Sequence, residues 1–390
     1  MRSLDSYHFS TDFHKEKKFI PTSVLLLFIF LSLSVYASAQ TQETTTIGGY
    51  GELHYNYNTE TKDARVNLSR FVLFAGHSFS EKIEFKSELE VENAKVAGGE
   101  SGGEVALEQA YLDFKFSDMT TFRAGLFIPA IGIINETHEP PTFNGVERPY
   151  LETKLIPATW REIGIGVLGK IPAVDGLSYK AFLVNGLDAK GFGGDEGIRE
   201  GRFEGRNANA NSLALTGKLE YVNMGLKVGA ALYYGGSSAG DTALAKGPFG
   251  TPVSLIALDA QYSIDNLSFR AVGATIHIPD AGAINTIDSS DIGKTLMGGY
   301  VEVAYNLMPH LCPDATSQLS PFIRYESFDL HSSVEAPLIR NDQYNQQYLI
   351  FGLTYKPLYN VVAKIDYTLE RNKAQVGETN LFNLGIGYSF

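Results

Sequence analysis

The chain ends in the stretch NLFNLGIGYSF, residues 380–390. Large apolar side chains stand at every second position back from the last residue, and small or polar ones stand between them. This period of two is that of a β-strand, whose successive side chains point to opposite faces. An apolar strand that ends on an aromatic residue, Phe390, would be frayed in water if it stood alone. We therefore expect it to close a larger sheet.

The same alternation runs through the chain from Thr46 onward and predicts about sixteen strands. No convincing helix is left between them. The predicted strands span residues 46–57, 64–79, 81–94, 104–116, 119–129, 160–171, 175–187, 207–222, 224–236, 253–264, 266–278, 297–308, 318–331, 344–356, 359–371 and 379–390.

The connections between these strands alternate between short and long. The short ones include FSEK, SDMT, SIDN and KPLYN; the long ones include AKVAGGESGG, DAKGFGGDEGIREGRFEGR and residues 130–159. Short periplasmic turns and long extracellular loops are typical of outer-membrane barrels with an even number of strands. The predicted fold class is therefore all-β, a transmembrane antiparallel β-barrel. The alternative, a soluble protein with an ordinary hydrophobic last strand, gives no reason for this sorting of loops.

The N-terminus predicts export. The charged run HKEKKF precedes the apolar run IPTSVLLLFIFLSLSVYASAQ, which ends in Ala37-Ser38-Ala39, a pattern cut by signal peptidase. We interpret residues 1–39 as a signal peptide cleaved after Ala39 and residues 40–390 as the barrel; an uncleaved membrane anchor is the alternative.

Cys312 is the only cysteine, so no internal disulfide is expected. The net charge of −12 argues against nucleic acid as a partner.

Aromatic residues gather at one end of the predicted strands. Several strands reach an aromatic residue on their apolar face just before a short turn, which predicts a girdle at the membrane interface. These residues are Phe114, Phe116, Tyr221, Tyr262, Tyr305, Tyr355, Tyr388 and Phe390. In lipid the last strand must pair with the first, TIGGYGELHYNYN (46–58), because unpaired backbone groups are costly there. Phe390 also resembles the C-terminal signal that the barrel-assembly machinery recognises.

A barrel of about sixteen strands is too wide for side chains to fill, so we expect an aqueous channel. Charged residues on the opposite face from the apolar ones form the predicted lumen wall. Any one of them is more simply interpreted as a structural charge in a cross-strand pair, because a wide pore needs polar walls whatever it conducts. The predicted wall includes Lys82, Glu84, Lys86, Glu88, Arg123, Arg324, Glu326, Lys364 and Asp366.

Three runs carry a resemblance to a known family: GYGELHYN, RFVLFAGHSFSEKIEFKSELEVENA and the stretch from Glu108 to Lys170. They resemble the porins related to the phosphate-selective porin O and P group, in the form found in Bacteroidetes. The resemblance implies a sixteen-stranded barrel, usually a homotrimer, whose third extracellular loop, here residues 130–159, folds inward and narrows the pore. It also implies outer-membrane lipid, lipopolysaccharide, the barrel-assembly machinery and small solutes as partners. The constriction residues would be Glu136, His138, Glu139, Glu147, Arg148, Glu152, Lys154 and Arg161.

Selectivity for phosphate is a separate question. Phosphate-specific members of that family use a ladder of inward arginines and a lysine cluster, whereas only Arg123 and Arg324 stand at confidently inward strand positions here. We therefore expect passive diffusion of small hydrophilic solutes or ions, with an anion- or phosphate-selective porin as the alternative. The excess of inward acids predicts a weak preference for cations, unless Arg148, Lys154 and Arg161 converge at the narrowest point.

Motifs for catalysis or cofactor binding are weak. GIGVLG (164–169) matches a dinucleotide fingerprint but lies within a predicted strand with no helix after it. The histidines show no metal-ligand spacing, and no Gly-x-Ser-x-Gly elbow is present. No cofactor, metal or catalytic residue is expected. The alternative from another class is an outer-membrane barrel enzyme or adhesin, but the long loops are mostly glycine, alanine and charged residues.

Overall fold

The computed structural model describes residues 43–94, 103–117 and 119–390. They belong to one compact unit, Glu43–Phe390. The predicted signal peptide and its cleavage after Ala39 lie outside the described residues.

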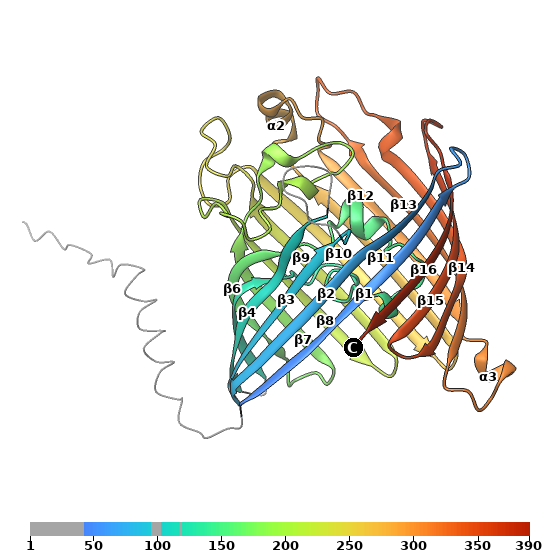
Figure 1. The fold of residues 1–390 in the computed structure, drawn as a ribbon. Coiled ribbons are helices and arrows are strands. Elements are labelled where there is room, and N and C mark those ends of the chain that lie inside the picture. Colours follow the sequence, from blue (N-terminus) through green and yellow to red (C-terminus); the bar gives the residue numbers. More distant parts are fainter. Residues whose placement is uncertain (1–42, 95–102, 118) are drawn as a thin grey trace, which may run out of the picture. The chain divides into compact units, whose positions relative to one another are not determined.

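Sixteen antiparallel strands form a closed barrel in which each strand pairs with its neighbours in sequence (Figure 1). The predicted fold class is confirmed, and each predicted strand corresponds to one observed strand. The strands are β1 (Thr44–Asn58), β2 (Ala64–Ser80), β3 (Ile83–Glu92), β4 (Val105–Ser117), β5 (Thr120–Phe127), β6 (Glu162–Lys170), β7 (Leu177–Asn185), β8 (Leu213–Asn223), β9 (Leu226–Gly236), β10 (Pro252–Ile264), β11 (Leu267–His277), β12 (Thr295–Tyr305), β13 (Gln318–Ser333), β14 (Asn345–Leu358), β15 (Val361–Asn372) and β16 (Asn380–Ser389).

The seam between β1 and β16 closes the barrel, as the terminal stretch predicted. The two strands pair antiparallel from Tyr50 opposite Ser389 to Asn58 opposite Leu381. Phe390 continues the ladder, because its N–H donates to the Gly49 carbonyl at 2.9 Å and its carbonyl accepts from the Gly49 N–H at 3.0 Å. Every strand therefore has two hydrogen-bonded neighbours.

Alternate residues on each strand point outward and inward. On β8, Leu215 is 51% exposed whereas Lys218 is 5% exposed; on β10, Leu258 and Asp259 are 59% and 4% exposed. Exposed apolar residues and enclosed charged residues are the reverse of a soluble protein. They are the arrangement that a strand in lipid requires when it borders a polar interior.

The connections differ at the two ends of the barrel. One end has tight turns; in the β8–β9 hairpin, Met224 and Gly225 both have positive φ (45° and 81°), as a two-residue type I′ turn needs. The other end has the long loops. Two short helices, absent from the sequence prediction, lie at opposite ends (Figure 1): α2 (Ala281–Asp288) and α3 (Met308–Leu311).

The remaining helical pieces are single turns within loops. They are η2 (Pro140–Thr142), η3 (Leu151–Leu155), η4 (Ala189–Gly191), η5 (Arg199–Gly201) and η6 (Asp342–Tyr344). In the described parts of the chain, no helix has the length and apolar character needed to cross a membrane.

Deleting Phe390 should lower the amount of folded barrel in outer membranes several-fold, because the seam loses two backbone hydrogen bonds and the terminal aromatic residue. Its side chain is 61% exposed and should not affect conduction by refolded protein. Phe116→Ala is the matched control, since Phe116 is an equally exposed aromatic residue (60%) near a tight turn. Heat-modifiable migration of membrane fractions on gels measures the folded barrel. Normal levels of the truncated protein would contradict the prediction.

Candidate functional site

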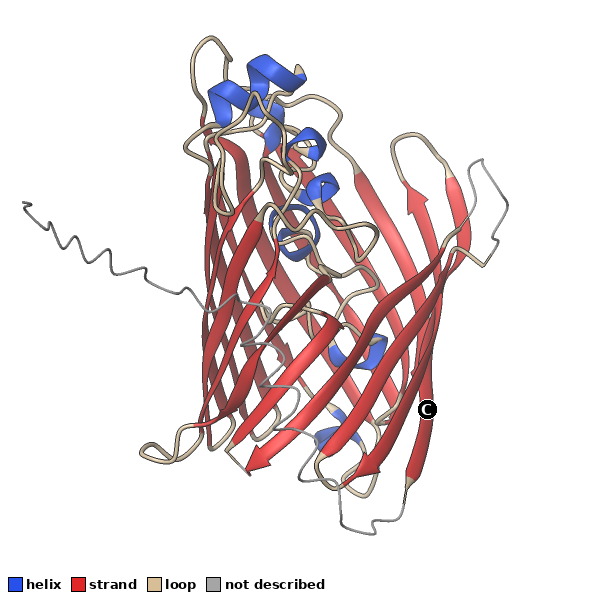
Figure 2. Ribbon diagram, turned by 90° about the vertical axis from the view of Figure 1, so that its left-hand side faces the viewer, coloured by secondary structure: helices blue, strands red, loops and turns tan. Residues whose placement is uncertain are grey.

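The segment between β5 and β6, residues 128–161, lies inside the barrel. Figure 2 shows helical turns enclosed by the wall of strands. This segment is the third loop. Its large apolar side chains are fully buried in one cluster with inward residues of β7 and β9–β14. At its end the ring of Trp160 lies 4.7 Å from that of Tyr233 on β9. The third loop therefore fills part of the lumen with an apolar core.

Buried carboxylates of the barrel wall hold the backbone of the third loop. Asp366 on β15 accepts a hydrogen bond from the Val146 N–H at 2.6 Å, and Glu326 on β13 accepts one from the Leu151 N–H at 2.8 Å. Hydrogen bonds to an ionised acceptor are stronger than neutral ones. These two predicted lumen-wall acids therefore bind the loop rather than face an open channel.

Arg324 on β13 belongs to the same network. Its guanidinium donates to Glu326 at 2.9 Å, to Glu302 at 3.2 Å and to the Asn144 carbonyl at 3.1 Å, and the side chain is 1% exposed. A buried charge is tolerated when it is paired and its donors are used. The charge of Arg324 is therefore used in binding the third loop and its neighbouring carboxylates, and it is not available to a passing ion.

Glu152 organises the loop from within. Its carboxylate accepts hydrogen bonds from the backbone N–H groups of Ile133 and Ile134, at 2.8 and 2.7 Å, and from the Tyr300 hydroxyl at 2.8 Å. Gly132 turns there with φ of 72°, and a Cβ at that position would lie 2.4 Å from the carboxylate. Complete burial outweighs the three donors and raises the pKa of Glu152 to about 7.

The glycines of the terminal strand make room for the loop. A Cβ at Gly387 on β16 would lie 2.3 Å from the Pro140 side chain, and one at Gly385 would lie 3.1 Å from that of Val146. Both positions face the lumen. The small residues that alternate with the apolar ones in LGIGYSF (384–390) thus have a packing role inside the barrel.

A polar cavity of about 130 Å³ borders the third loop near β1 and β2. Two ion pairs join residues of its wall: Arg70 with Glu52 at 3.0 Å, and His54 with Glu147 at 3.1 Å. The guanidinium of Arg148 has weaker contacts than these ion pairs. Its Nη2 donates to the His138 carbonyl at 3.4 Å, and its Nε has no hydrogen-bond partner among the described residues. The lining residues are Glu52, His54, Arg70, Val146, Glu147, Arg148, Tyr150, Thr153, Ala158 and Arg199.

The other predicted constriction residues are distributed over separate contacts. Glu136 binds Lys180 of β7, at 2.5 and 2.6 Å, and Lys154 forms an ion pair with Glu196 of an outer loop. Arg161 binds Glu204 at 3.1 Å. Glu139 has one buried carboxylate oxygen without a hydrogen bond. Of the three cations expected to converge, Arg148 lines the cavity, whereas Lys154 and Arg161 are not among its lining residues.

Two of the other predicted wall residues, Glu84 and Arg123, form cross-strand ion pairs. Glu84 pairs with Lys115 and lies 3.9 Å from Lys86, and Arg123 binds Asp113 through two hydrogen bonds of 2.8 and 2.9 Å. Lys82, next to β3, is exposed. The ammonium of Lys364 lies 3.6 Å from the centre of the Phe143 ring of the third loop.

Sequence reasoning missed two inward arginines. Arg70 on β2 is paired with Glu52, and Arg270 on β11 lies 3.9 Å from Glu302 and donates to the Thr142 carbonyl of the third loop at 2.7 Å. Their positions in the alternation could have revealed them, because Arg70 stands opposite Glu52 and Arg270 stands opposite Glu302 on the neighbouring strands.

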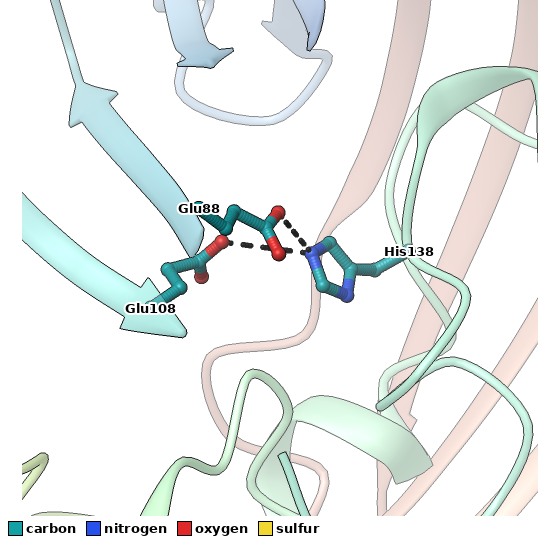
Figure 3. A group of neighbouring side chains, drawn as sticks. All are labelled: Glu88, Glu108 and His138. Carbon is teal, nitrogen blue, oxygen red and sulfur yellow. Dashed lines mark hydrogen bonds and ion pairs between the residues drawn. The ribbon is translucent and has the colours of Figure 1, made fainter. Parts of the chain in front are cut away.

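Three buried residues, Glu88, Glu108 and His138, lie close enough together to share a metal ion (Figure 3). They are the one group of this kind in the described ranges 43–94, 103–117 and 119–390. Histidine spacing did not reveal it because its members come from β3, β4 and the third loop. Burial lowers the pKa of His138, but the carboxylates of Glu108 and Glu88 more than offset this and raise it to about 9.

No protein-family model matches the chain. An uncharacterized protein of Aquifex aeolicus strain VF5 is 36% identical over 364 residues, which cover 90% of this chain and 81% of that protein. Solved structures with a similar fold include OmpF of Salmonella typhi (TM-score 0.58, 18% identity, 89% of this chain and 97% of that chain). The outer-membrane channel DcaP of Acinetobacter baumannii has a TM-score of 0.56 at 12% identity, covering 90% and 99% of the two chains.

Glu152→Gln should flatten the pH dependence of barrel stability. A carboxyl group whose pKa rises from 4.5 to about 7 on folding stabilises the fold fully below about pH 4.5 and loses that contribution as pH rises through 7. The loss is about 3 kcal/mol for a shift of this size. The free energy of unfolding in urea, measured from pH 4 to 8, should therefore fall more for the original protein than for the variant. Glu60→Gln, at an exposed loop residue, is the control; equal slopes for all three proteins would contradict the assignment.

Proposed function

The chain belongs to the same protein family as the Aquifex aeolicus protein, and we propose that it is a porin. In this proposal it allows passive diffusion of small hydrophilic solutes or ions through a water-filled channel in the outer membrane of a Gram-negative bacterium. The carrying observation is the closed sixteen-stranded barrel with apolar residues outside, charged residues inside and a loop across its lumen.

The interior chemistry favours conduction over catalysis. The inward charges of the described residues mostly join acids to bases across strands or bind the third loop, and these contacts shape a passage rather than activate a nucleophile. We therefore propose that the protein is not an enzyme. An outer-membrane enzyme or adhesin remains the alternative from another class.

An anion- or phosphate-selective porin is the second candidate. It follows the resemblance to the phosphate-selective porin O and P group, and one observation favours it: Arg70, Arg148 and Arg199 all line the polar cavity, against two glutamates, Glu52 and Glu147. Guanidinium groups match the geometry of phosphate. The acids elsewhere in the barrel favour cations, so the two candidates differ in whether the cavity or the whole lumen sets selectivity.

The remaining assignments follow that resemblance and the sequence of the N-terminus. We propose a homotrimer that contacts outer-membrane lipid and lipopolysaccharide and is inserted by the barrel-assembly machinery. Residues 1–39 would direct export and be removed after Ala39. We propose that the barrel is oriented in the outer membrane with its tight turns toward the periplasm and its long loops toward the outside of the cell.

Gly387→Val should increase single-channel conductance in planar bilayers. The new side chain would occupy the space of Pro140 and displace the third loop from β16, which widens the passage. Gly273→Val is the matched control, because a Cβ at this strand glycine meets its nearest neighbour at 4.0 Å. Conductance should rise measurably for the first variant and stay unchanged for the second. Folded, inserted protein that shows no discrete conductance steps at all would refute the porin proposal.

Arg148→Gln should shift the reversal potential in asymmetric potassium chloride toward greater cation preference, because it removes a weakly paired positive charge from the cavity. Lys246→Gln removes one positive charge from an exposed loop and serves as the control. Screening over roughly 8 Å at physiological salt should make the control shift negligible. Equal shifts for both variants would show that the cavity does not control selectivity.

A further inference from the structure

The strongest unassigned feature is the group formed by Glu88, Glu108 and His138 (Figure 3). Glu88 on β3 and Glu108 on β4 point from the barrel wall toward the imidazole of His138 in the third loop. The three side chains are 3%, 0% and 3% exposed. The group thus joins the wall and the loop at a place closed to bulk water.

The distances suit coordination better than hydrogen bonding. The His138 Nε2 atom lies 3.4 Å from Glu88 Oε1 and 3.6 Å from Glu108 Oε2. A metal ion about 2.0 to 2.2 Å from nitrogen and oxygen ligands in tetrahedral geometry places those ligands roughly 3.3 to 3.5 Å apart. Direct hydrogen bonds would be shorter, at about 2.7 to 3.2 Å.

Glu108 supplies an independent sign of a missing partner. Both of its carboxylate oxygens are buried, and neither forms a hydrogen bond with the described residues. Arg161 Nη1 is 3.8 Å from Oε1, but Arg161 also lies near Glu204 and Glu104, at 3.1 and 3.8 Å, so its charge is shared. A buried carboxylate without donors is costly, and a cation between the three side chains would remove that cost.

Neighbouring groups orient two of the three side chains. The His138 Nδ1 atom lies 3.1 Å from the Asn135 carbonyl and must donate to it, so Nε2 is the nitrogen that faces the two carboxylates, and a metal ion bound there would replace its proton. Asn135 is fixed in turn by the Pro129 carbonyl at 2.6 Å and the Trp160 N–H at 2.8 Å. Gln109 donates to the second oxygen of Glu88 at 2.7 Å. Such support is usual around metal ligands.

We propose that Glu88, Glu108 and His138 bind one divalent transition-metal ion that fastens the third loop to the barrel wall. Two carboxylates and one neutral imidazole balance a charge of +2, and this mixed set of ligands suits ions such as Zn²⁺, Fe²⁺ or Co²⁺ better than Ca²⁺ or Mg²⁺. Water completes the coordination. The proposal concerns equilibrium binding and does not depend on channel activity.

The test uses the full mature protein without a histidine tag, folded in detergent, with Co²⁺ as the probe and Zn²⁺ as competitor. Co²⁺ should develop visible ligand-field absorption at one equivalent, and Zn²⁺ should abolish it. Glu108→Gln should weaken Co²⁺ affinity at least about tenfold, since even loss of a supporting partner costs 10- to 100-fold. Glu84→Gln, at another inward glutamate of β3, should leave affinity unchanged.

Absence of one-equivalent binding by the original protein, or equal binding by Glu108→Gln, would overturn the proposal and leave a protonated His138 between two carboxylates. Should Glu108→Gln fail to fold, X-ray absorption of the Zn²⁺-loaded original protein decides. One imidazole nitrogen with oxygen ligands supports the site. Two imidazoles, or none, refute it.

Discussion

The structure depends on one constraint: in hydrocarbon, every backbone N–H and C=O must find a partner within the protein. Each unpaired group costs several kcal/mol there, so a sheet in lipid must close. The hydrogen bonds between Gly49 and Phe390 complete that closure at the last residue of the chain. Closure with sixteen strands then creates a second problem, because the enclosed space is wider than side chains from the wall can fill.

The third loop addresses that second problem, and it needs its own hydrogen-bond partners in the interior. Much of the loop backbone is irregular and buried, so its amides cannot rely on bulk water. The wall provides carboxylates at Glu326 and Asp366, and the loop provides Glu152. Several charges that look like the lining of an open channel are thus required to hold the loop that narrows it. Small residues at Gly385 and Gly387 give the loop its place against the seam.

The sequence predicted the fold well because each requirement of the barrel appears as a local sequence pattern. Contact with lipid gives alternating apolar residues, tight turns give short polar connections, and closure gives an apolar last strand. Every predicted strand corresponds to an observed one; the largest boundary difference is at β8, predicted from residue 207 and observed from Leu213, because polar residues before it form turns. The candidate site was less predictable. Inward parity identified Arg324 and Asp366 as lumen-facing, but their partners in the loop are far away in sequence. The apolar residues Val253 and Leu255 are buried in the same cluster as residues of the third loop, and composition alone would not place apolar side chains on the lumen side.

Because the sequence does not show which charged residues are paired, a count of inward charges is also a poor guide to ion selectivity. Summing inward acids and bases treats each as equally exposed to a passing ion, yet Arg324 with Glu326, and Lys218 with Asp259, are buried pairs whose fields largely cancel at a distance. The charges that an ion meets are those bordering the cavity and those left without a close partner. Arg148 belongs to both groups, and it was also one of the residues that resemblance to a known family had already placed in the constriction. Local pairing therefore carries more weight than net charge in a lumen that a loop has narrowed.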